Sequence, residues 1–209
     1  GCTQPQHAVH EQRQAVVHLP LAANDGLSSM GFALYGAGFI VPAEEAALLI
    51  EKEPVNREVL RPYRNGKDLA ARPRGAFVVD FGYREEADAR RYPMLFDLVR
   101  DRVKPERDAN RRDVIRRFWW RFGWPRRELR DALEGLGRYV ATPETAKHRF
   151  FTFLDATVAP DNKLICTSSA DAFHLGVLSS EIHVAWSLAA GVRLGVGNDP
   201  VYNKTRCFD

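Results

Sequence analysis

Residues 138–167 read RYVATPETAKHRFFTFLDATVAPDNKLICT, and this stretch decides the class of the fold. Short segments rich in β-branched and aromatic residues alternate there with turn-forming residues such as Pro160-Asp161-Asn162, a pattern typical of strands joined by tight turns. The strands predicted for this last third of the chain are Arg138–Thr142, Phe150–Leu154, Lys163–Thr167 and Phe173–Leu178.

The middle of the chain has a helical pattern instead. Helices are predicted at Arg84–Arg102, Asn110–Phe118 and Arg126–Leu133, with Pro105 separating the first two. An apolar stripe formed by Tyr92, Leu95, Phe96 and Val99 runs along the first helix. The aromatic cluster that follows, Trp119, Trp120, Phe122 and Trp124, is more typical of a core than of a base-stacking platform.

The remaining segments complete an α+β fold: mixed sheets, a cluster of helices in the middle and one C-terminal helix. Strands are expected at Ala15–Leu19, Met30–Val41 and Ala76–Phe81. Helices are expected from Pro42 to Glu51 and from the Ser179-Ser180-Glu181 cap to Ala190, and Leu60–Pro73 is expected to be a turn-rich loop. Residues 1–14 are expected to be disordered, and residues 15–209 to form one domain.

Composition restricts the class of protein. The chain has 209 residues, 45% of them hydrophobic, which is enough for a core without disulfides or metals. The net charge is only +3, but half of the 30 Lys and Arg residues lie between Arg84 and Arg130, interleaved with acids. Such a run indicates either a solvated helical face or a surface that contacts phosphates.

Cysteine usage and apolar patterning favour a cytoplasmic protein. Cys2, Cys166 and Cys207 form no CxxC pair and are expected to be unpaired thiols in a reducing compartment. The sequence has no apolar h-region near its start and no apolar run long enough to cross a membrane. We therefore expect neither a membrane partner nor a metal.

A search for catalytic motifs gives no candidate. Tyr35-Gly36-Ala37-Gly38 lacks the third glycine and the acidic residue of a dinucleotide-binding loop. Asp199-Pro200-Val201-Tyr202 resembles the Asp/Asn-Pro-Pro-Tyr motif of amino-methyltransferases, but Val201 replaces the second proline and too little sequence follows it. We expect this segment to be a loop, and this stretch of chain alone not to be an enzyme.

Four stretches, taken in order, resemble one known family. They are Arg61–Leu69 (RPYRNGKDL), Val103–Asp108 (VKPERD), Trp119–Gly123 (WWRFG), and Tyr139–Phe153 together with Gly176–Ser180. In this order and spacing the chain is similar to the target-recognition domain of MmeI-like, adenine-specific DNA methyltransferases of restriction–modification systems. The resemblance extends from about Leu19 to Phe208.

The resemblance implies a division of labour within a longer polypeptide. In this family a preceding domain binds S-adenosylmethionine and methylates adenine N6, whereas the domain resembled here reads the sequence of double-stranded DNA. The chain would therefore hold no cofactor itself. Its partners would be duplex DNA, the methyltransferase domain and a C-terminal region of the same polypeptide.

The resemblance also implies which residues meet DNA. The family reads bases from the loop and strand that follow a Thr/Val-Pro signature, which is Thr142-Pro143 here. The base-reading candidates are Glu144, Thr145, Lys147, His148 and Arg149, and Lys147 and Arg149 are expected to point the same way. The candidates for contacts with the DNA backbone are Arg64, Asn65, Lys67, Arg72, Lys104 and Arg107.

Alternatives remain open from the sequence. Arg61–Leu69 could equally pack against the catalytic domain, and the charges that follow Thr142 could be solvated. The chain as a whole could instead be a protein-interaction or structural domain, or a small self-contained nuclease or transferase.

Overall fold

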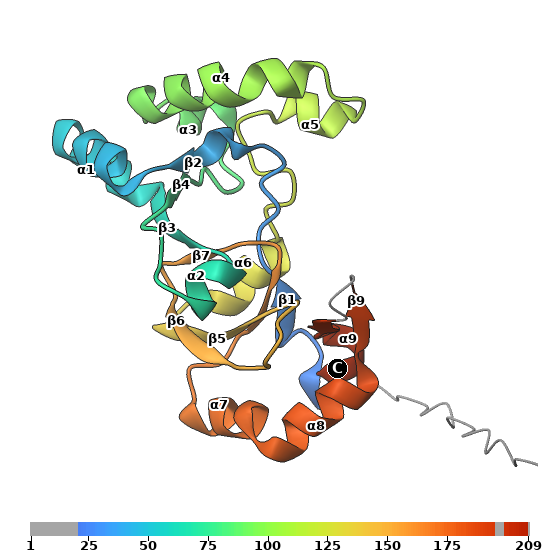
Figure 1. Cartoon of the computed structure of the whole chain (residues 1–209). Coiled ribbons are helices and arrows are strands. Elements are labelled where there is room, and N and C mark those ends of the chain that lie inside the picture. The colour runs from blue at the N-terminus through green and yellow to red at the C-terminus, as the bar shows by residue number, and fades with distance from the viewer. Residues whose placement is uncertain (1–20, 195–198, 209) are drawn as a thin grey trace, which may run out of the picture.

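The computed structural model describes residues 21–194 and 199–208, which form an α+β fold with mixed sheets, as predicted. Two four-stranded sheets follow one another along the molecule, and helices gather at both ends (Figure 1). The expected disordered start and the expected strand Ala15–Leu19 lie outside the described residues.

The first sheet is antiparallel throughout and contains three of the strands predicted in the last third of the chain. In spatial order its strands are β1 (Ser28–Met30), β8 (Leu164–Thr167), β5 (Arg138–Pro143) and β6 (Thr152–Asp155). The β5–β6 hairpin pairs Val140 with Phe153, and β5 pairs Val140 with Thr167 on its other side. β5 is therefore the central strand from which the loop after Pro143 departs.

The second sheet is mixed. In spatial order its strands are β2 (Ile40–Val41), β4 (Phe77–Val79), β3 (Leu60–Arg64) and β7 (Ala159–Pro160). The first three pair antiparallel, whereas β3 and β7 pair parallel, with Tyr63 opposite Ala159. β7 leads directly into the turn before β8, so the chain passes there from one sheet to the other.

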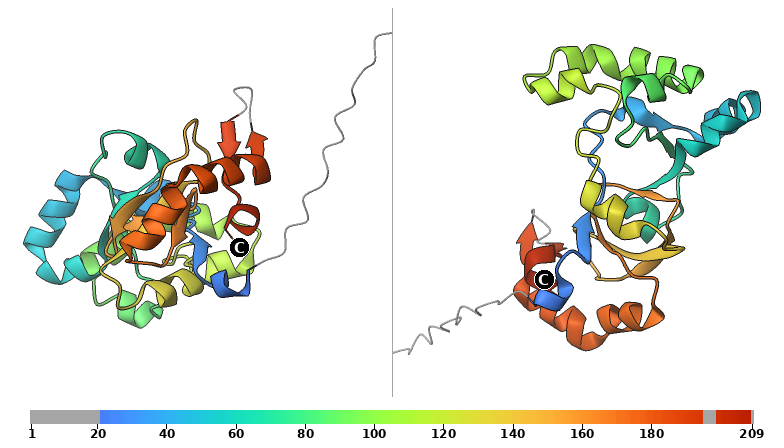
Figure 2. Two further views of the ribbon diagram at one scale, coloured as in Figure 1. Left: turned by 90° about the horizontal axis from the view of Figure 1, so that it is seen from below. Right: turned by 180° about the vertical axis from the view of Figure 1, so that it is seen from behind.

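Helices occupy the two ends of the molecule, as the right-hand view of Figure 2 shows. The group beside the second sheet comprises η2 (Ala37–Phe39), α1 (Ala43–Lys52), η3 (Pro54–Glu58), α3 (Glu86–Ala89), α4 (Pro93–Asp108) and α5 (Asp113–Arg117). At the other end lie η1 (Ala22–Asn24), α7 (Ala172–Ser179), α8 (Glu181–Ala190), the pair β9 (Val192–Leu194) and β10 (Asp199–Val201), and α9 (Lys204–Cys207). α2 (Gly66–Ala70) and α6 (Arg127–Leu133) lie between the two groups.

The two sheets approach each other so closely that one position requires glycine. Gly31 follows β1, and Phe32 forms a parallel bridge with Asp161 in the turn between β7 and β8. A Cβ atom on Gly31 would lie 2.2 Å from the carbonyl oxygen of Asp161, well inside van der Waals contact. Any larger residue at position 31 would therefore push the sheets apart.

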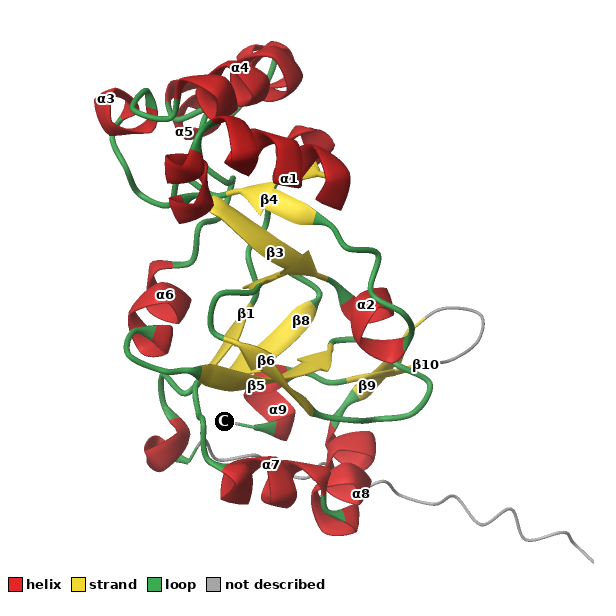
Figure 3. Ribbon diagram, turned by 90° about the vertical axis from the view of Figure 1, so that its left-hand side faces the viewer, coloured by secondary structure: helices red, strands yellow, loops and turns green. Residues whose placement is uncertain are grey.

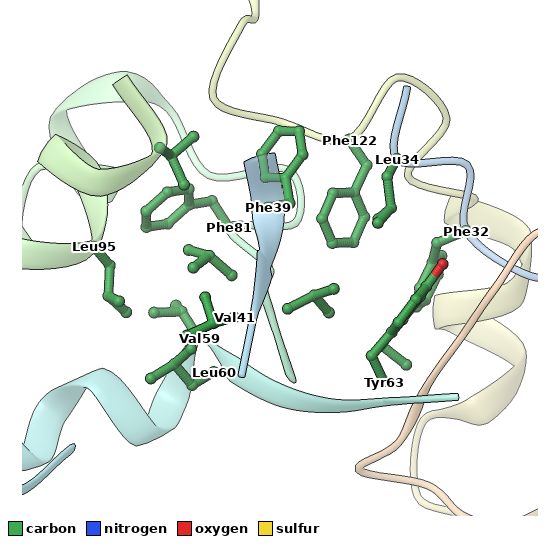
Figure 4. Close-up of a cluster of buried hydrophobic side chains, with 14 of the residues drawn as sticks. Phe32, Leu34, Phe39, Val41, Val59, Leu60, Tyr63, Phe81, Leu95 and Phe122 are labelled. Carbon is green, nitrogen blue, oxygen red and sulfur yellow. The ribbon is translucent and has the colours of Figure 1, made fainter. Parts of the chain in front are cut away.

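One hydrophobic core joins the second sheet, α4 and the segment after α5. Phe39, Phe81, Leu95 and Phe122 are almost completely buried members of one apolar cluster (Figure 4), in which the rings of Phe39 and Phe122 pack edge to face. The core also takes in Trp119, which stacks edge-on against Phe96 at a centroid distance of 5.0 Å. The predicted packing role of this aromatic cluster is confirmed for Trp119, Trp120 and Phe122, whereas Trp124 is exposed.

A buried carboxylate holds α6 against the second sheet. The side chain of Asp80 is 1% exposed and accepts hydrogen bonds from Arg130 at 2.7 Å, from Arg61 at 3.2 Å and from the Gly82 amide. Burial raises the pKa of Asp80, but the two guanidinium groups outweigh it, so the net pKa is lowered. Both arginines also lie over the ring of Phe32, which completes a compact ionic cluster.

The structure corrects the predicted helices of the middle region. Arg84–Arg102 is two helices, because Pro93 starts α4 at its first turn after a break. Pro105 does not separate two helices: it lies inside α4, which continues to Asp108. Leu60–Pro73 is not a loop, because it contains the strand β3 and the helix α2. Pro62 is tolerated in the strand, and the Asn65 side chain caps the helix.

Two predicted strands are also wrong. Met30–Val41 breaks after β1, because Tyr35 (φ 49°) and Gly36 (φ 134°) adopt positive φ values that end an extended chain. Phe173–Leu178 is the helix α7, whose first turn is capped by the Asp171 side chain accepting from the Phe173 amide. The predicted helices at Pro42–Glu51 and Ser180–Ala190 are confirmed as α1 and α8.

The helices α7 and α8 expose apolar side chains. Phe173 is 69% and Ile182 85% exposed, and both line an open groove of about 660 Å³. No helix within residues 21–194 and 199–208 is long and apolar enough to cross a membrane. Cys166 and Cys207 are buried and not disulfide-bonded, as expected for thiols that serve in packing.

Candidate nucleic-acid interface

A basic cleft of about 780 Å³ brings together the two segments that the sequence singles out for DNA. One wall is α2 with the residues just before and after it, and the other is the loop 143–149, which we call the reading loop. The turn between β7 and β8 closes the base with Asp161 and Lys163. Figure 3 shows α2 beside the end of β5, where a Cβ atom on Gly66 would lie 3.3 Å from Pro143.

The α2 wall is built by a reciprocal cap. The Asn65 side chain accepts hydrogen bonds from the amides of Lys67 at 3.0 Å and Asp68 at 3.1 Å. The Asp68 carboxylate in turn accepts from the Asn65 amide at 3.0 Å. A short helix therefore forms where the sequence suggested only a loop, and it fixes the direction in which the exposed Lys67 projects.

Arg74 reinforces this cap from the far end of α2. Its Nε and Nη2 atoms bind the two oxygens of Asp68, each at 2.9 Å, and its amide binds the same carboxylate at 3.0 Å. Burial raises the pKa of Asp68, but the bonds from Arg74 and Asn65 outweigh it and bring the pKa down to about 2. Asp68 is therefore ionised at any physiological pH.

The reading loop is held by backbone pairing on both sides. The Glu144 amide donates to the Lys163 carbonyl at 2.8 Å, and the Ala146 amide donates to the Pro200 carbonyl at 3.3 Å. Thr145 also forms an isolated bridge with Val201. The loop is consequently a fixed ledge with Thr145, Lys147 and His148 exposed toward the cleft.

The two remaining base-reading candidates already have partners within the protein. The Glu144 carboxylate accepts from Lys163 Nζ at 2.8 Å. The half-buried Arg149 donates to the Glu144 carbonyl at 3.2 Å and does not line the cleft, whereas Lys147 is exposed and lines it. The expectation that Lys147 and Arg149 point the same way is wrong, because bends at positions 147 and 148 interrupt the strand alternation on which it was based.

The candidates for backbone contacts fall into two places. Asn65 and Lys67 line the cleft, whereas Arg64 and Arg72 do not line it. Arg64 is half-buried and donates to the Tyr63 carbonyl at 2.9 Å, while Arg72 is exposed. Lys104 lies on α4, in the helical group at the other end of the molecule, and is ion-paired with Asp108 at 2.5 Å.

Arg107 cannot serve as a surface clamp. It is 2% exposed, donates to the Leu34 carbonyl at 2.6 Å and lies over the ring of Phe39. Burial lowers the pKa of its guanidinium. The expected phosphate contact at Arg107 is therefore replaced by a packing role, since this side chain lies on the core-facing side of α4.

Three charged residues of the cleft were not among the sequence candidates: Arg74, Asp161 and Lys163. Asp161 accepts a hydrogen bond from the Tyr63 hydroxyl and another from the Lys163 amide at 2.9 Å, so it shapes the floor of the cleft. Burial, together with this bond to Asp161, raises the pKa of Tyr63 well above its ordinary value. The Pro160-Asp161-Asn162 turn signal marked the place, but only the parallel pairing of β3 with β7 brings it beside α2.

Within residues 21–194 and 199–208, no group of three or more His, Cys, Asp or Glu side chains could hold a metal ion. Asp199–Val201 forms β10, and Tyr202, which follows it, is 2% exposed. The segment that resembled a methyltransferase motif thus packs beneath the reading loop.

The fold and its cleft define an α+β module with one concave basic surface between two sheets. Among solved structures, the chain is similar to the type IIL restriction-modification enzyme MmeI, solved in complex with DNA, with a TM-score of 0.71 and 18% sequence identity. The match covers 94% of this chain and 25% of that enzyme, so the chain spans about a quarter of MmeI's length. No family model and no curated protein matches the chain. At this identity the likeness shows the fold, and it agrees with the resemblance of the sequence to MmeI-like enzymes.

Proposed function

We propose that this chain is the target-recognition module of an adenine-specific, S-adenosylmethionine-dependent DNA methyltransferase of restriction–modification type. The observation that carries the proposal is the cleft, where α2 and the reading loop, far apart in sequence, present exposed cations to one surface. The shared fold with part of a DNA-bound restriction-modification enzyme supports it. Methylation and cofactor binding would belong to another domain of the same polypeptide.

The cleft residues divide into two roles by chemistry. Thr145, Lys147 and His148 lie on a fixed ledge and carry donors and acceptors that suit base edges in the major groove. Lys67 projects from the opposite wall as a flexible point charge, which suits a phosphate oxygen. In this proposal the ledge reads sequence and the α2 wall fixes the register of the duplex.

A random duplex library tests the proposal directly. The chain should enrich one short motif, and its affinity should fall as salt rises, because phosphate contacts release counterions. Lys147→Ala should relax discrimination at one position of the motif by about 1–3 kcal/mol. Lys67→Ala should instead weaken binding to all sequences and reduce the salt slope by about 0.9.

Lys104→Ala is the matched control, because it removes the same charge from the helical group away from the cleft. It should leave both the motif and the salt slope unchanged. If the chain enriches no motif, the proposal is wrong, whatever the response of its DNA affinity to salt. For the complete polypeptide, N6-methyladenine mapping should place the modified base within the same motif, and the Lys147→Ala variant should relax that motif.

One observation favours a second candidate, a protein-interaction module. α7 and α8 expose Phe173, Val177 and Ile182 on one open apolar groove, and such patches mark contact surfaces. Salt-insensitive binding to protein partners without sequence enrichment of DNA would favour this candidate over the first.

A further inference from the structure

Arg149, at the end of the reading loop, directs its guanidinium under the loop. Its Nη1 atom donates to the Thr142 hydroxyl at 2.9 Å and to the Pro143 carbonyl, and its Nη2 atom donates to the carbonyls of Glu144 at 3.2 Å and Pro200 at 3.3 Å. A planar guanidinium holds several donors in fixed directions, whereas the donors of a lysine ammonium rotate about one compact charge. One side chain therefore joins the start of the loop to β10.

Tyr202 supports the same guanidinium from below. The Arg149 guanidinium carbon lies 5.1 Å from the centroid of the Tyr202 ring, a cation–π distance. The Tyr202 hydroxyl is 2.9 Å from His183 Nε2, which ties this support to α8. The rings of Phe151 and Tyr202 pack edge to face at 5.4 Å. Arg149 thus rests on an aromatic base that the first sheet and α8 share.

The backbone of Asp199–Tyr202 pairs with the loop as a further short strand. The Ala146 amide donates to the Pro200 carbonyl, and the Tyr202 amide donates to the Glu144 carbonyl at 2.7 Å. Within the loop, these bonds and those of Arg149 involve the backbone of Pro143, Glu144 and Ala146. The side chains exposed toward the cleft belong to other residues of the loop. The support therefore sets the backbone from which Thr145, Lys147 and His148 project.

We propose that Arg149 is a positioning residue for base reading: it touches no base, and it fixes the conformation of the reading loop together with Asp199–Tyr202. The proposal rests on the proposed function and deepens it. The specificity element then consists of two segments distant in sequence, the loop 143–149 and the strand that ends at Tyr202. A loop sequence moved to another chain without that strand would lose its defined geometry.

Arg149→Lys is the decisive variant, because it keeps the charge and removes the guanidinium geometry. Discrimination should fall at every position that the loop reads, by tenfold or more in total, while binding to random DNA and its salt slope stay within twofold. Hydrogen exchange should quicken at least tenfold at the amides of Ala146 and Tyr202. The amides of Ala141 and Cys166, in the centre of the first sheet, should exchange as before.

Arg138→Lys is the matched control at the other end of β5, where Arg138 is exposed and donates to the Ala170 carbonyl at 3.0 Å. It should change neither specificity nor exchange in the loop. Loss of discrimination at one position with unchanged exchange would overturn the proposal and make Arg149 a base contact. Unchanged exchange and unchanged specificity would overturn it as well.

The exchange measurement needs no DNA, so it separates this proposal from the proposed function. If the unaltered chain enriches no motif, the proposed function fails. Faster exchange in Arg149→Lys at the amides of Ala146 and Tyr202 would still show that Arg149 fixes the conformation of the loop. Unchanged exchange would refute that role. Tyr202→Leu offers a second route, because it removes the ring beneath the guanidinium and should increase exchange at Ala146 in the same direction.

Discussion

Asp68→Asn gives the sharpest test of how the α2 wall is built, because charge and geometry predict opposite results. Asp68 lies beside a basic cleft, so removing its negative charge should by charge alone tighten DNA binding, by up to about twofold after screening. Its carboxylate, however, accepts four hydrogen bonds that define the cap of α2. If the geometry of α2 matters more, DNA binding should weaken instead.

The cost to stability can be worked out from the structure. The pKa of Asp68 falls from 3.8 to about 2, which corresponds to about 2.4 kcal/mol at roughly 1.36 kcal/mol per unit. The Arg74 side chain is 52% exposed, so solvent screening reduces this to about 2 kcal/mol. An asparagine keeps one oxygen and turns an NH₂ group toward the donors of the other. We therefore expect a loss of about 2 kcal/mol and a fall in Tm of about 4–8 °C.

The pH dependence follows from the sign of the shift. The folded-state pKa lies below the unfolded value of 3.8, so the contribution of Asp68 is fully present above that pH. It is lost as the pH falls through about 2. The stability difference between the unaltered chain and Asp68→Asn should therefore be constant from pH 5 to 8 and shrink only in strong acid.

Thermal unfolding and fluorescence anisotropy with random-sequence duplexes provide the two measurements. DNA affinity should fall at least threefold and at most about thirtyfold, the factor that corresponds to 2 kcal/mol. Asp101→Asn is the control, since Asp101 is 68% exposed and pairs with Arg100 on the surface of α4. A variant Asp68→Asn that binds DNA more tightly and unfolds within about 1 °C of the unaltered chain would refute the reasoning.

Three other predictions follow from burial. Asp80→Asn should cost about 3–5 kcal/mol in chemical denaturation, because it leaves Arg61 and Arg130 without their carboxylate; a loss below 1 kcal/mol would mean that the ionic cluster is dispensable. Ile182→Glu should change stability by less than about 0.5 kcal/mol, since Ile182 is 85% exposed, and a larger loss would show that α8 packs differently. Burial, and to a smaller extent the neighbouring Arg149 guanidinium, lowers the pKa of His183, so the folded state favours the neutral imidazole. Stability should therefore decline as the pH falls below about 6.5. His183→Gln should show a smaller decline between pH 7 and 5.5, and equal declines would contradict the prediction.

Local signals in the sequence predict much of the fold. Pro42 and the acids after it predict α1, and the alternation of β-branched residues with turns predicts β5, β6 and β8. The segment Phe173–Leu178 defeats this reasoning, because a short run of apolar residues suits either a buried strand or a helix. The cap at Asp171 decides the outcome, and a single hydroxyl or carboxylate before an apolar run is easily overlooked.

Arg107 shows a signal that was present but outweighed. Val99, Val103 and Arg107 recur at intervals of four, so all three lie on the same face of α4 and all are buried. Taking Pro105 as the end of the helix hid this periodicity and placed Arg107 in a loop. A proline in a helix interior costs a backbone hydrogen bond, and here the packing of the apolar face offsets that cost.

The site required tertiary information that no local pattern holds. Asn65 and Lys67 were predicted to meet the DNA backbone, and Lys147 and His148 to read bases, but the sequence gives no indication that they share a cleft. The contact of α2 with the end of β5 creates that surface. Arg149 was grouped with the exposed residues because only the folded loop reveals which charged side chains already have partners inside the protein.

This distinction between engaged and available charges limits what the module can do alone. Within residues 21–194 and 199–208, the side chains of Lys67 and Lys147 make no hydrogen bond or ion pair, whereas Arg74 and Lys163 line the cleft but are bound to Asp68 and Glu144. Two available cations give a salt slope of about −1.8, and recruitment of the two engaged ones would extend it to about −3.6. The proposed methyltransferase would then have to supply most of a long duplex footprint from outside this chain. A slope for the isolated chain much steeper than −3.6 would place further phosphate contacts outside the cleft, with the exposed Arg72 the first residue to test.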